Sequence, residues 1–248
     1  MSTPSSFGFV RVSGADAANF LNGQFSHSTL NMGPGDGRLG AFCTPKGRAF
    51  ASAFLLAVDE GFELWTLNAT LPTLVASLRR YIMRAKVTFD DVPSVRDAAF
   101  TLPDGTQLDL GSAQIEAQTI AAGVPVIHAA NAEAFVPQMI NLDLLEGIDF
   151  AKGCYTGQEI VARTQNLGTI KRRMLPFACA DTAGLVPGDK VTVAESAVGR
   201  IVSVGSDRVL ASLRLASLNE TLVAGEHNIP LGEQLTLPYA IPELSAET

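Results

Sequence analysis

Apolar residues in the first ninety positions form strand-like runs separated by turn residues. Five such runs predict strands at 8–12, 38–43, 48–58, 62–67 and 86–89. The sequence Thr44-Pro45-Lys46-Gly47 lies between two of these runs and predicts the turn of a β-hairpin.

Two other stretches of this region have helical spacing. Apolar residues recur every three or four positions over 71–83, which predicts a helix. Ser13, with Asp16 three residues later, resembles a capping box and predicts a second helix. That helix would turn Phe20 and Leu21 inward. Because strands and helices would share one core, the predicted class is α+β.

From about Arg173 the pattern changes to short β-rich runs separated by glycine and proline. These runs predict a small antiparallel β-barrel, with strands at 190–193, 199–204, 209–215 and 234–237. Between 92 and 118 the pattern predicts only a hairpin across 103–106. We therefore expect an α+β domain over 1–170, with a shortened middle lobe, and a barrel domain over 171–248.

Composition and charge narrow the function classes. Apolar residues make up 47% of the chain, charged residues make up 17%, and the formal net charge is −7. Direct binding to nucleic acid is not expected, because that affinity depends on clustered lysine and arginine. The chain has neither an apolar run of about eighteen residues nor the layout of a signal peptide. We expect a cytoplasmic protein with no membrane partner.

The cysteines and histidines form no metal-binding pattern. Cys43, Cys154 and Cys179 lie far apart in the sequence, so we expect three reduced thiols. None of the three histidines stands beside a set of ligands, and a solvated or hydrogen-bonded role is expected for each. No metal site is predicted.

The segment from Lys152 to Glu159 carries the strongest chemical signal. Thr156 and Glu159 have the spacing of a capping box, which predicts a helix that begins at Gly157. Cys154 would then lie just outside a helix N-terminus, where the dipole and the Lys152 cation favour a thiolate. The alternative is that this cysteine is a small buried apolar residue.

This segment resembles the signature of the YgfZ family of folate-binding proteins, which are implicated in iron–sulfur cluster maintenance and are related to the T-protein of the glycine cleavage system. The resemblance covers Lys152–Arg163 and the preceding segments 135–141 and 147–150. It extends to residues 19–24 and to the predicted hairpin turn, and is weakest between 92 and 118.

The resemblance implies a T-protein-like folate-binding fold with a C-terminal antiparallel barrel. It implies a folate-binding accessory protein that supports assembly or repair of iron–sulfur clusters, and through them enzymes such as tRNA-modifying ones. Its partners would be the iron–sulfur assembly machinery or client enzymes. Cys154 would be the working thiol and Lys152 would hold its thiolate. A reduced folate, such as tetrahydrofolate, would be bound by Gln138, Asn141, Gly153, Tyr155, Gly157, Gln158, Glu159 and Arg163.

Some of these roles have alternatives. The glycines at 153 and 157 would let backbone approach a ligand or adopt positive φ. Asn141 could face a pterin edge or cap the short helical turn expected over 141–145. The cluster Lys171-Arg172-Arg173 is either a solvated entry to the barrel or a site for a ligand's glutamate tail. Lys46 and Arg48 are either surface charges or close to the folate.

Two departures from the family pattern weaken the enzymatic reading. Ala51 and Ser52 occupy the position of the carboxylate that serves T-protein-like relatives, so aminomethyltransferase activity is not expected. Ala121 replaces a glutamate that can pair with the pterin, so folate binding should be weak. Two alternatives stay open: a tetrahydrofolate-dependent one-carbon transferase that uses Cys154, and a protein with a vestigial cleft in which the motif only packs.

Overall fold

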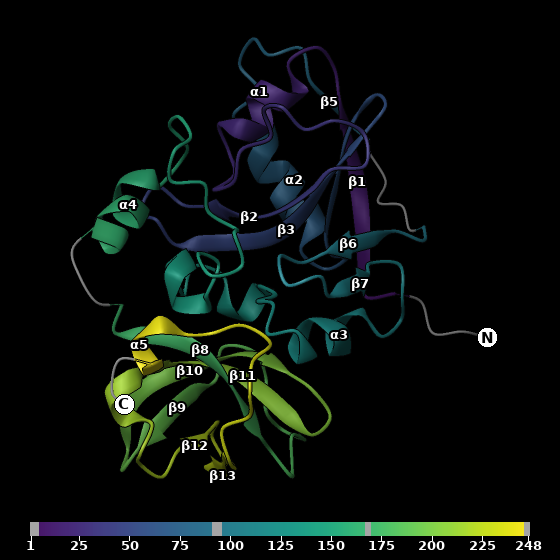
Figure 1. Cartoon of the computed structure of the whole chain (residues 1–248). Coiled ribbons are helices and arrows are strands. Elements are labelled where there is room, and N and C mark those ends of the chain that lie inside the picture. The colour runs from purple at the N-terminus through teal and green to yellow at the C-terminus, as the bar shows by residue number, and fades with distance from the viewer. Residues whose placement is uncertain (1–4, 91–95, 167–169, 246–248) are drawn as a thin grey trace.

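A five-stranded antiparallel sheet forms the centre of the N-terminal region (Figure 1). The computed structural model describes residues 5–90, 96–166 and 170–245. The sheet order is β2-β3-β4-β1-β5. Its strands are β1 Phe7–Ser13, β2 Gly37–Cys43, β3 Ala49–Val58, β4 Gly61–Leu67 and β5 Thr88–Phe89. The hairpin predicted around residues 44–47 is confirmed as the β2–β3 connection.

Both faces of this sheet are buried, because alternate residues of its strands enter different cores. Helices α1 (Ala17–Asn22) and α2 (Leu71–Arg79) pack against one face, where Val10 and Val12 of β1 lie. Phe7 and Phe9 of the same strand enter the second core on the opposite face. Such alternation is what a strand with a period of two residues requires.

Short elements from the middle of the chain cover that second face. They are the hairpin β6 (Ala99–Thr101) and β7 (Gln107–Asp109), the helix α3 (Ile115–Ala121), and the 3-10 turns η1 (Ala129–Asn131) and η2 (Pro137–Ile140). The hairpin was predicted, whereas α3 was not. Figure 1 shows these elements between the upper sheet and the lower C-terminal sheet.

A curled antiparallel sheet forms the C-terminal half-barrel, with the order β13-β12-β9-β10-β11-β8. Its inner face encloses a separate core that includes Leu175 and Phe177. The strand predicted over 234–237 is wrong, since only an isolated bridge joins Gln234 to Phe177. The strands are β8 Arg172–Ala178, β9 Lys190–Val193, β10 Ser196–Val204, β11 Arg208–Arg214, β12 Val223–Ala224 and β13 Ile229–Pro230.

The outer face of the half-barrel packs against the middle of the chain. Met174, Val202 and Leu210 belong to the same core as the lower face of the N-terminal sheet. The turn η3 (Leu215–Ser217) and the short helix α5 (Pro242–Ser245) complete this region. The architecture is therefore α+β with a C-terminal antiparallel half-barrel, as predicted.

The start of α1 differs from its prediction. Asp16 occupies the N-cap position, but its side chain makes no capping hydrogen bond. Its carboxylate accepts a hydrogen bond from the Lys86 backbone N–H at 2.7 Å, so a long-range partner replaces the local one. Phe20 and Leu21 are buried as predicted.

Candidate functional site

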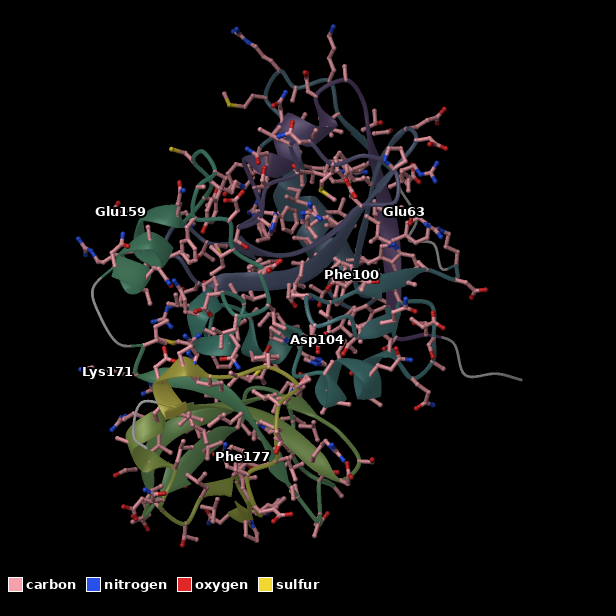
Figure 2. The ribbon with its side chains drawn as sticks, in the orientation of Figure 1. Glu63, Phe100, Asp104, Glu159, Lys171 and Phe177 are labelled. Carbon is pink, nitrogen blue, oxygen red and sulfur yellow. The ribbon has the colours of Figure 1, made fainter. Side chains whose placement is uncertain are left out.

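The segment that begins at Lys152 forms a loop that leads into α4 (Gln158–Asn166) on one side of the molecule (Figure 1). The helix predicted to begin at Gly157 is present and begins at Gln158, one residue later, but the predicted capping box is not formed. Within the described residues, the Thr156 side chain makes no hydrogen bond, and Glu159 lies exposed on α4 at the edge of the molecule (Figure 2). The Gln158 N–H donates to the Tyr155 carbonyl at 3.2 Å.

Gly157 approaches protein backbone in this structure. Its φ is +82°, and a Cβ built on it would lie 2.4 Å from the Thr44 carbonyl oxygen and 2.9 Å from Gly47 Cα. Glycine is required here because a side chain would collide with the hairpin turn. Gly153 is exposed, with no atom within 4 Å of a built Cβ. Of the two glycines, only Gly157 therefore has a packing role that the structure explains.

Lys152 anchors the loop to the end of α1. Its Nζ donates hydrogen bonds to the carbonyl oxygens of Asn22 at 2.5 Å, Phe25 at 2.6 Å and His27 at 3.2 Å. A cation is favourable there because the last carbonyls of a helix have no partner within the helix. The ammonium also lies 4.9 Å from the centre of the Tyr155 ring.

The environment of Lys152 brings the pKa of its amine closer to neutral pH. Burial lowers its pKa to about 8, and the Asp149 carboxylate acts in the opposite direction. Among the described residues, none of its hydrogen bonds goes to Cys154. The expectation that Lys152 holds a Cys154 thiolate is therefore corrected: the lysine holds three carbonyl oxygens.

Cys154 is the exposed cysteine of the three. It lies outside the helix as expected, four residues before the first residue of α4 and one position farther from it than predicted. Cys43 is buried in the core, which raises the pKa of its thiol to about 12. Cys179 is also buried, and burial raises its pKa. Cys154 is thus not a core residue, and its sulfur is accessible from solvent.

Gln138 and Asn141 are fully buried and bind protein backbone. The Gln138 amide nitrogen donates to the Val161 carbonyl at 2.8 Å. Asn141 Nδ2 donates to the Met174 carbonyl at 2.7 Å, and Asn141 Oδ1 accepts from the Met174 N–H at 3.1 Å. These side chains join η2 to α4 and to the half-barrel. The structure does not place them in an open folate cleft.

The remaining predicted residues lie apart from one another. Glu159 and Arg163 are exposed on α4, whereas Tyr155 is buried beneath Lys152. Gln158 is half-buried, and its amide nitrogen is 3.5 Å from the Lys152 carbonyl. The structure therefore brings together Lys152, Tyr155 and Gln158, and leaves Glu159 and Arg163 at the surface.

The fit of a reduced folate rests on two buried polar atoms without a hydrogen-bond partner, Gln138 Oε1 and the Tyr155 hydroxyl. Burial raises the pKa of Tyr155, so its phenol stays a neutral donor. An acceptor and a donor of this kind suit the alternating edge of a pterin. Both atoms are enclosed, so a ligand could reach them only if the surrounding packing opened.

The residues at the positions that depart from the family pattern have the following surroundings. Ala51 is fully buried, and the Ser52 hydroxyl donates to the Pro125 carbonyl at 2.9 Å and accepts from the Ile127 N–H at 3.2 Å. Ala121 is exposed at the last position of α3. Neither Ala51 nor Ser52 supplies an acid.

Sequence reasoning missed a buried ion cluster around Arg173. This guanidinium, with a side-chain exposure of 2%, contacts Asp143 at 2.7 Å and Glu243 at 2.8 Å. The basic cluster predicted at 171–173 is thus divided, with Lys171 exposed and Arg173 buried. Strand alternation was the available signal, because Arg173 shares a face with the buried Leu175 and Phe177.

Two absences apply to the described part of the chain. It contains no group of three His, Cys, Asp or Glu side chains placed to hold a metal ion. Among the same residues, no helix is both long and apolar enough to cross a membrane.

Sequence comparisons identify relatives of both parts of the chain. Residues 171–238 match the family described as the CAF17 C-terminal beta-barrel domain. The tRNA-modifying protein YgfZ of Enterobacter sp. (strain 638) is 29% identical over 230 residues, which cover 71% of this chain and 70% of the relative. An uncharacterized protein of Haemophilus influenzae is 32% identical over 194 residues, which cover 68% of this chain and 69% of the relative.

Two further similarities come from a fungal relative and a crystal structure. The mitochondrial iron-sulfur cluster assembly factor IBA57 homolog of Mycosarcoma maydis is 28% identical over 69% of this chain and 55% of its own length. The glycine cleavage system aminomethyltransferase T of Bartonella henselae has a similar fold, with a TM-score of 0.62 and 11% identity over 94% of this chain and 84% of the other. The chain therefore belongs to the YgfZ-type family, with a T-protein-like fold and a CAF17-type C-terminal barrel.

Proposed function

We propose that this protein is an accessory factor for assembly or repair of iron–sulfur clusters, and that through them it supports enzymes such as tRNA-modifying ones. The names of two relatives support the proposal, since one is a tRNA-modifying protein and the other an iron-sulfur cluster assembly factor. Cys154 is its working thiol. The observation that carries this role is the exposed sulfur on a loop whose position is fixed from both sides.

The loop is fixed by contacts with the backbone of other segments, and these contacts do not involve the cysteine. Lys152 holds the end of α1, and Gly157 packs against the hairpin turn. Between them, Cys154 has no hydrogen-bond partner among the described residues. A sulfur on a firmly held loop needs little ordering when a partner protein approaches, and less ordering leaves more of the interaction free energy for binding.

A reduced folate such as tetrahydrofolate is the proposed ligand, bound through the Gln138 Oε1 and Tyr155 O–H groups. The affinity should be micromolar or poorer, because the enclosing packing must open first and the glutamate expected at Ala121 is missing. When bound, a reduced folate would supply a one-carbon carrier. The chain's own contribution would be to bind and orient the pterin.

Aminomethyl transfer is not proposed. The Ser52 hydroxyl is already engaged with two backbone groups, and Ala51 has no titratable atom. General acid–base assistance contributes roughly 10² to 10⁴-fold to a rate, so its loss would leave only slow turnover. Ammonia release from an aminomethyl-lipoyl donor at an enzymatic rate would contradict this.

Complementation tests the proposed role of Cys154. In a cell that lacks the protein, wild-type protein should restore the activity of iron–sulfur enzymes, and Cys154→Ser should not. The serine keeps the shape of the side chain but cannot act as a thiol at neutral pH. Cys179→Ala is the matched control, because it removes a buried thiol far from the motif. Full complementation by Cys154→Ser would reject the proposed role.

A further inference from the structure

A pocket with four cationic side chains lies where the β2–β3 hairpin meets the half-barrel. It has a volume of about 290 Å³. Arg48 reaches it from the hairpin side, and Arg172, Lys190 and Arg200 reach it from strands β8, β9 and β10. No aspartate or glutamate is among its described lining residues.

The register of the half-barrel places like charges directly opposite one another. Lys190 pairs with Arg200 across β9 and β10, and Arg172 pairs with Arg214 across β8 and β11. All four lie on the outer face of the sheet, since Arg200 is opposite Ser212 and Ser212 is opposite Met174. Like charges in directly opposite positions destabilise a sheet. Two such pairs on one face are therefore unfavourable for the fold alone.

None of the four pocket cations has an ion-pair partner within the described part of the chain. The three arginines instead each donate one hydrogen bond to a backbone carbonyl. Arg48 binds Ala134 at 2.9 Å, Arg172 binds Val198 at 2.8 Å, and Arg200 binds Gly188 at 2.8 Å. A guanidinium has five N–H donors, so most donors remain available while the single bond fixes its orientation.

The pKa of Arg172 shows that its charged form is destabilised in this arrangement. Burial lowers its pKa, and repulsion by Arg214 and then by Arg48 lowers it further. The repulsion from Arg48 also means that cations from the hairpin and from the half-barrel act on the same space. An anion between them would attract each of these cations and so offset the repulsion.

We propose that this pocket binds a small, multiply charged oxyanion that carries phosphate or carboxylate groups. Guanidinium forks match both groups in a bidentate manner. A small ligand is favoured because the pocket is near the lower end of the size range of small-molecule sites. A nucleic acid is disfavoured because the net charge of −7 repels a long polyanion from the rest of the surface.

This inference is argued from the pocket residues alone, although the family resemblance left open that Arg48 and the 171–173 cluster lie near a folate and its glutamate tail. Cys154, Gln138 and Tyr155 do not line the pocket. The residues of the basic cluster at 171–173 also have separate roles in the structure. Arg172 lines the pocket, whereas Arg173 is paired with Asp143 and Glu243 inside the protein.

Titration calorimetry on the full chain with pyrophosphate and with citrate tests the proposal. We expect at least one of them to bind, with an affinity that falls as sodium chloride rises from low to high concentration. Arg172→Met and Arg200→Met should each weaken binding tenfold or more. Arg208→Met is the matched control on β11, because Arg208 is partly exposed and already paired with the exposed Asp207. It should bind as the wild type does.

Comparison of the two probes shows which anionic group the pocket prefers. Preference for pyrophosphate assigns the pocket to phosphate-bearing ligands, and preference for citrate assigns it to polycarboxylates. Absence of binding by both at millimolar concentration would overturn the proposal, as would equal binding by the wild type and the folded Arg172→Met and Arg200→Met variants. Arg200 is exposed, so its substitution keeps the test valid even if Arg172→Met fails to fold.

A stability measurement gives an independent readout. The bound probe should raise the urea midpoint of the wild type, because a ligand that binds only the folded state stabilises it. It should leave the midpoint of Arg200→Met almost unchanged. An equal rise in both proteins would also count against the pocket.

Discussion

Gly157 and Gly47 face each other so closely that a Cβ on Gly157 would lie 2.9 Å from Gly47 Cα. The contact is reciprocal, since a Cβ on Gly47 would lie 3.1 Å from the Gly157 carbonyl oxygen, and it would also lie 2.6 Å from Ile160 Cβ. Both glycines also have positive φ, at +82° and +66°. The start of α4 and the hairpin turn are thus fitted to each other through two residues without side chains.

Gly157→Ala should lower the free energy of unfolding by about 2–4 kcal/mol, because it combines a strained φ with overpacking. Urea denaturation measures the change. Gly153→Ala is the matched control, four residues earlier in the same loop and with no atom within 4 Å of its Cβ. It should change the stability by less than about 0.5 kcal/mol. Equal effects of the two substitutions would contradict the packing described for Gly157.

Lys152→Met should destabilise the protein by about 2 kcal/mol, since three carbonyl oxygens lose a charged donor while the aliphatic stem is kept. Lys46→Met, at the exposed hairpin tip, is the control and should melt as the wild type does. Thermal unfolding of the two variants compares them directly. A Lys152→Met protein of undiminished stability would mean that the carbonyl oxygens are equally well satisfied by water.

Arg173→Met should cost about 3–5 kcal/mol, because it leaves the Asp143 and Glu243 carboxylates buried without their partner. Arg208→Met removes an arginine from an exposed ion pair of the same sheet, and its urea midpoint should stay unchanged. The comparison separates the buried cluster from a general effect of charge. A small effect of Arg173→Met would indicate that the two acids reach solvent in the variant.

Stability should fall as the pH decreases below about 6.5. Burial is the main cause that lowers the pKa of both His27 and His128. Arg38 and Lys152 lower the pKa of His27 further, whereas its Ser28 contact and Asp149 oppose the shift. For His128, Glu116 opposes it.

The sign follows from proton uptake. Below pH 6.5 the unfolded chain binds protons on these histidines before the folded chain does, so the free energy of unfolding decreases with falling pH. Urea midpoints measured at several pH values from about 7.5 down to about 5.5 should show this slope. His27→Gln with His128→Gln should flatten it, and the exposed His227→Gln should not. An unchanged slope in the double variant would assign the effect to other groups.

Iodoacetamide should modify Cys154 before the other two cysteines in the native protein. Cys154 is exposed, while burial of Cys43 and Cys179 restricts access and raises the pKa of both thiols. Mass spectrometry of briefly treated protein should find one modified peptide. Cys154→Ser should remain unmodified over the same period. Equal early labelling at Cys43 would contradict the burial described here.

Periodicity predicted the parts of the fold that depend on nearby residues. The β2–β3 hairpin and the inward side of α1 follow from alternation and helical spacing, and both are present. Helix starts were predicted less well. The carboxylate of Asp16 binds Lys86 N–H, seventy positions away, and α4 begins where Gly157 meets the hairpin. Such partners are invisible to a local pattern.

In the candidate site, too, local interactions were predicted better than interactions with distant residues. The exposure of Cys154 agrees with its predicted place outside a helix, because that argument used only neighbouring residues. Lys152 was assigned to the nearby sulfur, whereas its partners are more than one hundred positions away. The Gln138 amide nitrogen and both amide atoms of Asn141 bind backbone groups at positions 161 and 174, which the sequence did not predict. Polar side chains with distant partners need the fold itself.

The double hydrogen bond between Asn141 and Met174 also bears on aggregation. β8 is the last strand of its sheet, and an open edge strand can pair with another molecule. Asn141 has a left-handed backbone, and its amide binds the Met174 N–H and C=O as a neighbouring strand would. Farther along the edge, Leu235 donates to Pro176 and Ala178 donates to Glu233. A side chain and a non-strand segment thus occupy the edge and protect this half-barrel from intermolecular β-pairing.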